Sequence, residues 1–364
     1  MRIVLIILVI IHALLHLVGF AKAFGIAEIK QLTEPIPKTT GLFWLLAFTL
    51  FLVTAILFGL KNNYWWIAGL LAVIISQLLI IYSWQGARFG TNINVIILIA
   101  CIGAYTSWSY YGNYKKEVII NLRQAPYFSK DTLSESDIQP LPLMVANYIR
   151  YSGSVGKPKV NNFRLEFTGN IRKDEKSGWM PFTSLQYNFM GIPTRLFFLK
   201  AVMKMLPVAG YHRFKNGHAF MDIRLFSLFK VQFQDGSAMD IAETVTFFND
   251  MCCMAPATLI DKRISWKEKE NNAVTAIFTN NGISITADLY FNDIGALVNF
   301  TSKDRYAADA GKQLPWATPL KDYAILDGFK LAGYAETIYT YPDRDLCYGT
   351  FKLTSVKYNC TAFD

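Results

Sequence analysis

The chain has 364 residues, 52% of them hydrophobic and 17% charged, and its formal net charge is +9. Six basic and two acidic residues fall within the first 112 positions, so the positive surplus is mild in both parts of the chain. No Lys/Arg stripe or nucleic-acid-binding motif occurs, which excludes that class of protein.

Four apolar runs dominate the first 112 residues, and each is close to the ~20 residues that a helix needs to cross a bilayer. None of the runs contains Asp or Glu, and they are Ile3–Phe24, Gly41–Leu60, Tyr64–Trp84 and Ile93–Gly112. Backbone groups in lipid must pair internally, so each run is predicted to be a transmembrane helix. The first run begins after Arg2 like a signal peptide, but its length and the three runs that follow favour a retained helix.

The positive-inside rule leaves the side of the membrane nearly undecided. Five basic residues lie on the side of the N-terminus and four on the other. We therefore expect an integral membrane protein, and the count favours only slightly a cytoplasmic position for the rest of the chain.

The remaining residues predict a linker over 113–142 and a soluble β-rich domain over 143–364. Period-two alternation and turns such as Asn216-Gly217 indicate about thirteen strands, as in antiparallel sheets. Helices are predicted at Leu143–Tyr151 and Asp240–Met251. The predicted fold is thus four transmembrane helices (1–112) followed by an antiparallel α+β domain, a curved half-barrel sheet wrapped on a helix. A β-sandwich with an incidental helix is the alternative.

Polar residues within the spans are the sharpest local signal. His12 and His16 share one helix face, and polar side chains in spans usually face the bundle interior. They indicate either a metal, haem or proton site, or a packing face bonded to partners such as Gln77. Because a metal needs three or four ligands, the sequence favours packing. Arg88, in the turn after the third span, is read as an interfacial anchor or a lipid-phosphate ligand.

The soluble part offers aromatic groove candidates rather than a catalytic set. Trp179, Met180, Phe182 and Trp316 are predicted to line an apolar groove that binds a ligand. The alternative for each is an ordinary core position. No P-loop, dinucleotide fingerprint or zinc-protease motif occurs, and the five cysteines form no zinc-type pairs. No metal and no cofactor are therefore expected.

A set of motifs resembles a family of uncharacterised bacterial membrane proteins that carry a C-terminal domain of unknown function. The motifs are the stretch from Ile11 to Phe24, Ala87–Gly90, Tyr148–Gly156, Gly178–Phe182, Pro315-Trp316 and Val356–Asn359. The chain departs from the family pattern over 250–256. This resemblance implies the architecture and no reaction. The order of strands, helix and strands also looks like the LolA-like lipoprotein-carrier half-barrels, an analogy at the level of fold.

These observations favour a membrane-anchored domain that binds a lipid or another apolar ligand, without an identified reaction. Membrane lipids are the expected partners, and no protein partner is indicated. The alternatives are an enzyme that acts on a membrane-associated substrate through His212, His218 and Asp222, and a membrane assembly or structural protein. A non-enzymatic role is favoured because no nucleophile motif accompanies these residues.

Overall fold

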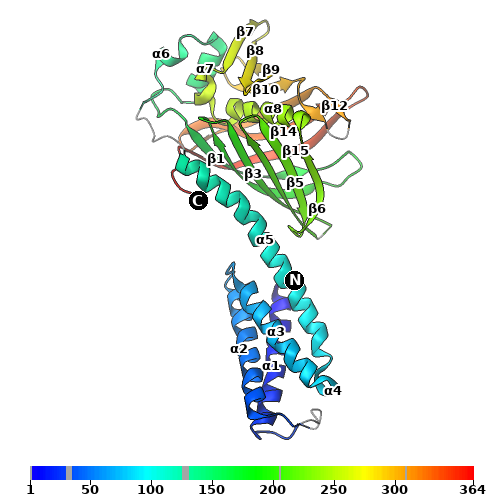
Figure 1. Ribbon diagram of the computed structural model, residues 1–364. Coiled ribbons are helices and arrows are strands. Elements are labelled where there is room, and N and C mark those ends of the chain that lie inside the picture. Colours follow the sequence, from blue (N-terminus) through cyan, green and yellow to red (C-terminus); the bar gives the residue numbers. More distant parts are fainter. Residues whose placement is uncertain (1, 30–34, 125–130, 205, 308–309) are drawn as a thin grey trace. The chain divides into compact units, whose positions relative to one another are not determined.

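A computed structural model describes residues 2–29, 35–124, 131–204, 206–307 and 310–364 of the chain. The chain divides into two compact units, Met1–Tyr110 and Tyr111–Asp364. Figure 1 traces both along the sequence. Each unit is described by itself below.

The N-terminal unit is helical, as its apolar runs predict. Its elements are α1 (Arg2–Ala23), α2 (Lys38–Gly59), α3 (Trp65–Tyr82), the short α4 (Trp84–Ala87) and the first part of α5 (Gly90–Gln124). Four of these helices, α4 excepted, are long and apolar enough to cross a membrane. Small residues allow their close approach: a Cβ added at Gly19 of α1 would lie 2.3 Å from the Trp44 ring of α2. Close backbone contact at small residues is typical of helix packing in membranes.

The C-terminal unit contains the rest of α5, two short helices, α6 (Glu135–Ile138) and α7 (Leu143–Tyr151), and then the sheet. The first six strands are β1 (Asn162–Ile171), β2 (Met180–Phe189), β3 (Thr194–Met203), β4 (Leu206–Lys215), β5 (His218–Leu225) and β6 (Phe229–Asp235). The helix α8 (Ser237–Met254) and the 3-10 helix η1 (Pro256–Ile260) follow. The remaining strands are β7 (Ile264–Lys269), β8 (Ala273–Asn280), β9 (Ile283–Phe291), β10 (Leu297–Ser302), β11 (Tyr306–Ala307), β12 (Lys312–Gln313), β13 (Trp316–Leu326), β14 (Phe329–Thr340) and β15 (Asp345–Tyr358).

Thirteen strands form one antiparallel sheet in the order β6-β5-β4-β3-β2-β1-β15-β14-β13-β10-β9-β8-β7. Within the described residues β6 and β7 are its two edges, so the sheet is open and the half-barrel prediction is confirmed. The sheet has two arms, one of the strands β1 to β6 and the other of the strands β7 to β10 and β13 to β15. The helix α8 contacts strands from both arms, and Figure 1 shows it lying against the curved sheet. Every residue of α8 from Ala242 to Met254 is buried.

The two faces of the sheet carry different partners. The inner face packs on α8: the Phe214 ring of β4 lies 5.5 Å from the Phe247 ring. The outer face of the same strand bears Arg213, whose Nε donates to Glu117 Oε1 of α5 at 2.6 Å. Strand residues alternate between faces, so odd and even positions of β4 contact different helices.

The two arms of the half-barrel are tied together at one end. Arg263, just before β7, donates from Nη2 to the Met190 carbonyl in the β2–β3 turn at 2.6 Å. Asn281, in the β8–β9 turn, donates to the Asn216 carbonyl in the β4–β5 turn at 2.8 Å. These two hydrogen bonds join turns of the first strands, β2 to β5, to the segments that precede β7 and connect β8 to β9.

The structure differs from the sequence prediction in the length of the fourth helix. The apolar run ends at Gly112, yet α5 continues to Gln124. The reason is tertiary, because the added turns bind the outer face: Tyr114 donates to the Leu185 carbonyl at 3.0 Å, and Glu117 accepts from Tyr211 at 2.7 Å. Residues 125–130 of the expected linker lie outside the described residues.

Candidate ligand site

Alternation in β4, β5 and β6 builds an aromatic row on the outer face near the sheet edge. Arg213 lies opposite Phe220, and Asp222 lies opposite Phe233, so these four side chains share one face. The Phe220 and Phe233 rings are stacked at 6.1 Å, and the Tyr211 ring meets Phe220 edge-on at 5.5 Å. Cross-strand aromatic pairs of this kind stabilise a sheet and also offer a flat apolar wall.

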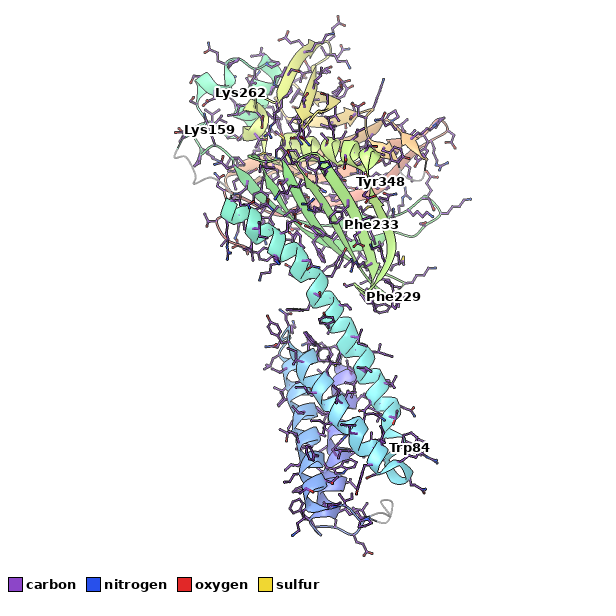
Figure 2. All side chains as sticks on the ribbon, in the orientation of Figure 1. Trp84, Lys159, Phe229, Phe233, Lys262 and Tyr348 are labelled. Atoms are coloured by element: carbon purple, nitrogen blue, oxygen red, sulfur yellow. The ribbon has the colours of Figure 1, made fainter. Side chains whose placement is uncertain are left out.

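This row borders a hollow of about 280 Å³, here called the edge groove. Its lining residues are Arg213, His218, Ala219, Phe220, Phe233, Asp235, Gly236 and Asp240. Phe233 is 44% exposed, and Figure 2 labels it on β6 at the sheet edge. An apolar wall with a few polar groups is the usual make-up of a small-molecule site.

The polar end of the edge groove is held by fixed partners. Asp240, in the first turn of α8, accepts the backbone N–H of Ala219 at 2.7 Å, and its other oxygen lies 3.7 Å from His218 Nδ1. Arg213 is paired with Glu117. These contacts position the charged groups before any ligand arrives, which lowers the entropic cost of binding.

A second polar cluster lies inside the half-barrel, between β2–β3 and α8. Arg195 donates to Asp250 Oδ2 at 2.8 Å, to Glu243 Oε2 at 3.1 Å and to Gln186 Oε1 at 3.1 Å. Asp250 also accepts from Gln186 and Asn188 at 2.7 and 3.1 Å. The cluster joins α8 to the sheet, and its charges are compensated as buried charges must be.

Burial and charge pull the pKa values of this cluster apart. Burial raises the pKa of Asp250 despite its hydrogen bonds. Burial opposes ionisation of Glu243 too, but Arg195, His212 and Arg305 outweigh it and hold the pKa of Glu243 below its ordinary value. Burial lowers the pKa of His212 to about 4, so this ring is neutral at pH 7.

A second arginine, Arg305 of the opposite arm, also binds α8. The guanidinium of Arg305 donates to the Ala242 carbonyl at 3.0 Å and to the Thr246 hydroxyl. It also lies 4.6 Å from the centre of the Trp316 ring, and Trp316 donates from Nε1 to the Tyr348 hydroxyl at 3.1 Å. Two arginines from the two arms therefore hold α8 by polar contacts on the inner face.

The structure separates the four residues predicted to line a groove. Trp179 is 42% exposed and lies under the Arg172 guanidinium, whereas Met180 is half-buried. Phe182 and Trp316 are core residues, with 4% and 2% of their surface exposed. Phe182 packs on Phe351 of β15 with ring centres 5.1 Å apart. The four do not meet in one exposed groove, and a ligand contact for them stays a prediction.

The three residues considered for an enzyme lie on two faces of the sheet. His212 lies opposite Met221 on the inner face, whereas Asp222 lies opposite Tyr211 on the outer face and pairs with Arg224. His218 lies at the end of β5, near Asp240. Because side chains of one strand alternate, His212 and Asp222 cannot act on the same substrate atom.

The polar residues of the spans form one hydrogen-bonded cluster. His12 Nε2 lies 2.9 Å from Asn94 Oδ1, and His16 Nε2 lies 2.8 Å from Ser76 Oγ. Gln77 accepts from Asn94 Nδ2 at 3.1 Å. Arg88 is exposed, with its guanidinium 5.1 Å from the Phe89 ring.

Metal ligands do not gather anywhere in the part of the chain that the structure describes. No group of three or more His, Cys, Asp or Glu side chains there has an arrangement that holds a metal ion. The five cysteines are free thiols. Burial raises the pKa of both Cys252 and Cys253, so neither is poised as a thiolate.

Residues 131–351 match the family described as "Family of unknown function (DUF6544)". The chain belongs to the DUF6544 family. This confirms the predicted resemblance to a family with a domain of unknown function. The match begins before α6 and ends within β15, so it takes in nearly the whole sheet and both candidate clusters.

Three solved structures are similar to this DUF6544 chain, each at 8% sequence identity. A domain described as an outer membrane lipoprotein-sorting protein, from Vibrio parahaemolyticus, has a TM-score of 0.36 and covers 56% of this chain and 88% of its own. A DUF1329 family protein from Desulfovibrio piger has a TM-score of 0.36, with coverage of 61% and 94%. A LolA superfamily protein from Nitrosomonas europaea has a TM-score of 0.35, with coverage of 60% and 95%. No curated protein matches the sequence.

The edge groove was missed by the sequence reasoning, and the local pattern misleads here. Next to the turn Leu225 lies opposite Phe229, and a regular register continued from that pair would put Phe220 and Phe233 on opposite faces. A β-bulge between Ile223 and Arg224 shifts the register and brings both rings to one face. The burial of Phe182 and Trp316 carried no local signal either, because an aromatic residue suits a core position and a groove equally well.

Proposed function

We propose that the C-terminal unit is a membrane-anchored binding module for a lipid or another apolar ligand, and that the ligand binds in the edge groove. The observation that carries this proposal is the stacked, partly exposed Phe220–Phe233 pair beside the hollow. A stacked aromatic pair beside a hollow offers a flat apolar wall to a ligand.

The size and lining of the groove set the class of ligand. At about 280 Å³ it lies near the lower end of ligand pockets, which favours one acyl chain or one apolar ring system. Arg213, which is paired with Glu117, and the carboxylates of Asp235 and Asp240 suit a polar or cationic head group, while Phe220 and Phe233 suit the apolar part. The four candidate spans would hold this site at the membrane from which such a ligand comes.

The proposal includes a place in the cell. The chain would reside in the bacterial inner membrane with its C-terminal unit in the cytoplasm, where cysteines such as Cys347 and Cys360 stay reduced. Fusing a cytoplasm-active and a periplasm-active reporter to Asp364 tests the side. Activity of only the periplasmic reporter would overturn the cytoplasmic placement and leave the ligand proposal standing.

Ligand binding is tested with the full chain in detergent and a photoreactive fatty acid as the probe. We expect crosslinks to map to β5 and β6, and Phe233→Ser to weaken labelling by about 5- to 30-fold, as the loss of one aromatic contact predicts. The matched control is Ile277→Ser on β8, since Ile277 is 42% exposed and Phe233 is 44% exposed. The control should label like the wild type.

Two outcomes would overturn the proposal. One is equal labelling of the Phe233→Ser and Ile277→Ser chains. The other is crosslinking that maps outside β5 and β6, because the ligand would then bind elsewhere. Native mass spectrometry of the wild-type chain, with the bound lipid released by collision, provides an independent readout.

A further inference from the structure

Two hairpin turns at one end of the sheet expose a cluster of large apolar side chains. This cluster, here called the tip patch, is Val202, Met203, Leu206, Phe226, Leu228, Phe229 and Val231, each between 37% and 61% exposed. The start of β4 and the β5–β6 turn are joined by a hydrogen bond from the Phe226 N–H to the Pro207 carbonyl at 2.9 Å. Figure 2 labels Phe229 on β6 near this end. The patch is thus one surface built from two adjacent hairpins.

The tip patch lies away from the turns that tie the arms of the half-barrel. Strand β4 runs from Leu206 in the tip patch to Lys215, which precedes the turn at Asn216. Asn216 is bound by Asn281, whereas the far end of the strand ends in exposed side chains. Ten residues of strand separate the two ends by roughly 33 Å.

Backbone geometry shows that the aromatic residue at the tip is held in an unfavourable conformation. Phe226 and Ser227 both have a φ of +54°, in the left-handed region. A bulky residue rarely adopts this region, where Asn and Gly are preferred. Other two-residue turns in this sheet follow that preference, with Asn216-Gly217, Asn281-Gly282 and Asp327-Gly328 at positive φ. The β5–β6 turn departs from the favoured residues in order to present a phenyl ring, and local strain of this kind is typical of functional sites.

The charges around the tip patch are of one sign. Residues 199–211 and 223–234 contain Lys200, Lys204, Arg224 and Lys230, and no Asp or Glu. Arg224 pairs with Asp222, and the Lys230 ammonium lies 4.3 Å from the centre of the Phe233 ring. Apolar side chains flanked by lysines match the head-group boundary of an anionic bilayer, where the apolar groups enter and the lysines meet the phosphates.

We propose that the tip patch docks on the surface of a lipid bilayer that contains anionic lipids. The candidate spans of the same chain keep a bilayer at high local concentration, so a small patch suffices for binding. The docking rests on different residues from the edge groove, and it would deliver a bilayer ligand to that groove. It therefore deepens the proposed function but is tested separately from it.

The test uses the full chain in nanodiscs of phosphatidylcholine, with and without phosphatidylglycerol. A fluorophore is attached through Phe229→Cys in a chain whose Cys347 and Cys360 are replaced by serine, because the other three cysteines are buried. The matched control carries the fluorophore through His218→Cys, at the other end of β5, where the side chain is 76% exposed. With phosphatidylglycerol present, we expect iodide to quench the label at position 229 several-fold less than the label at 218.

Charge removal and oligomer analysis decide the outcome. Lys204→Gln and Lys230→Gln should each lower the ratio of docked to undocked chain about fivefold, as expected for one lysine near an anionic surface. The proposal would be overturned if iodide quenched the labels at positions 229 and 218 equally, both in the nanodiscs and after vesicles of the same lipids are added. Protection that depends on protein concentration and not on lipid would also overturn it, because a second copy would then cover the patch. Phe220→Ser alters the edge groove at a residue outside the tip patch and should leave the protection at 229 unchanged, so failure of the groove and failure of docking are distinguishable.

Discussion

Removing the Arg195 guanidinium is the most direct perturbation of the contact between α8 and the sheet. Arg195→Met keeps most of the side-chain volume but removes the bonds to Asp250, Glu243 and Gln186. Two carboxyl groups then stay buried without their cation, since Glu243 and Asp250 are only 2% and 9% exposed. We expect α8 to become the least stable helix of the C-terminal unit.

The magnitude follows from the burial of the partners. Removing one member of a buried ion pair costs about 3–5 kcal/mol, a large part of the ~5–15 kcal/mol by which a domain is stable. Arg213→Met on the outer face is the matched control, because the Arg213 and Glu117 side chains are 27% and 22% exposed. A pair that solvent reaches contributes about 1 kcal/mol or less.

Urea unfolding of the full chain in detergent, followed by near-UV circular dichroism, measures both variants. The pH dependence has a definite sign: the pKa of folded Glu243 lies below its ordinary value of 4.5, so the wild type loses this contribution as the pH falls below that value. The difference between Arg195→Met and wild type should therefore shrink at acidic pH. A loss for Arg195→Met no larger than that for Arg213→Met would refute this account of how α8 is held.

Three further perturbations are predicted. Gly217→Ala should lower the free energy of unfolding by about 1 kcal/mol or more, because φ at this position is +81°. Gly191→Ala is the control and should be neutral, because a Cβ at Gly191 would meet no atom within 4 Å. Equal urea midpoints for the two variants would contradict this prediction. Gly19→Ala should lower the thermal unfolding temperature of the helical unit by forcing Trp44 away, and an unchanged temperature would show that the helices separate freely. The wild type should lose free energy of unfolding as the pH falls from 6.5 to about 4, because burial lowers the pKa of His212 to about 4 in the folded protein. His212→Phe should reduce this loss. Identical pH profiles of the free energy of unfolding would refute the prediction.

Much of the architecture was readable from local patterns. The helix α7 has its predicted bounds, Leu143–Tyr151, and the predicted Asn216-Gly217 turn joins the strands β4 and β5. These elements form where propensity, periodicity and turn residues agree. The two-stranded ribbon of β11 and β12 was not predicted, because strands of two residues have no periodicity to detect.

The candidate site was less predictable than the fold. The aromatic residues that stood out, Phe182 and Trp316, are core residues, whereas the exposed pair is Phe220 and Phe233. Composition cannot separate these cases, because burial depends on which strands become neighbours and on where the sheet ends. His212 was grouped with Asp222 by proximity in sequence, and the register of β4 and β5 then put them on opposite faces.

By itself, the sequence determined the four apolar helices, the antiparallel strands with their turns, and the membership of a family of unknown function. These depend on length, hydrophobicity and local backbone preference, which are properties of consecutive residues. Tertiary structure decided that α5 extends to Gln124, that Arg195 and Arg305 converge on α8 from the two arms, and that Phe226 and Phe229 share an exposed patch. Such features join residues far apart along the chain, and only the curvature and register of the sheet bring them together.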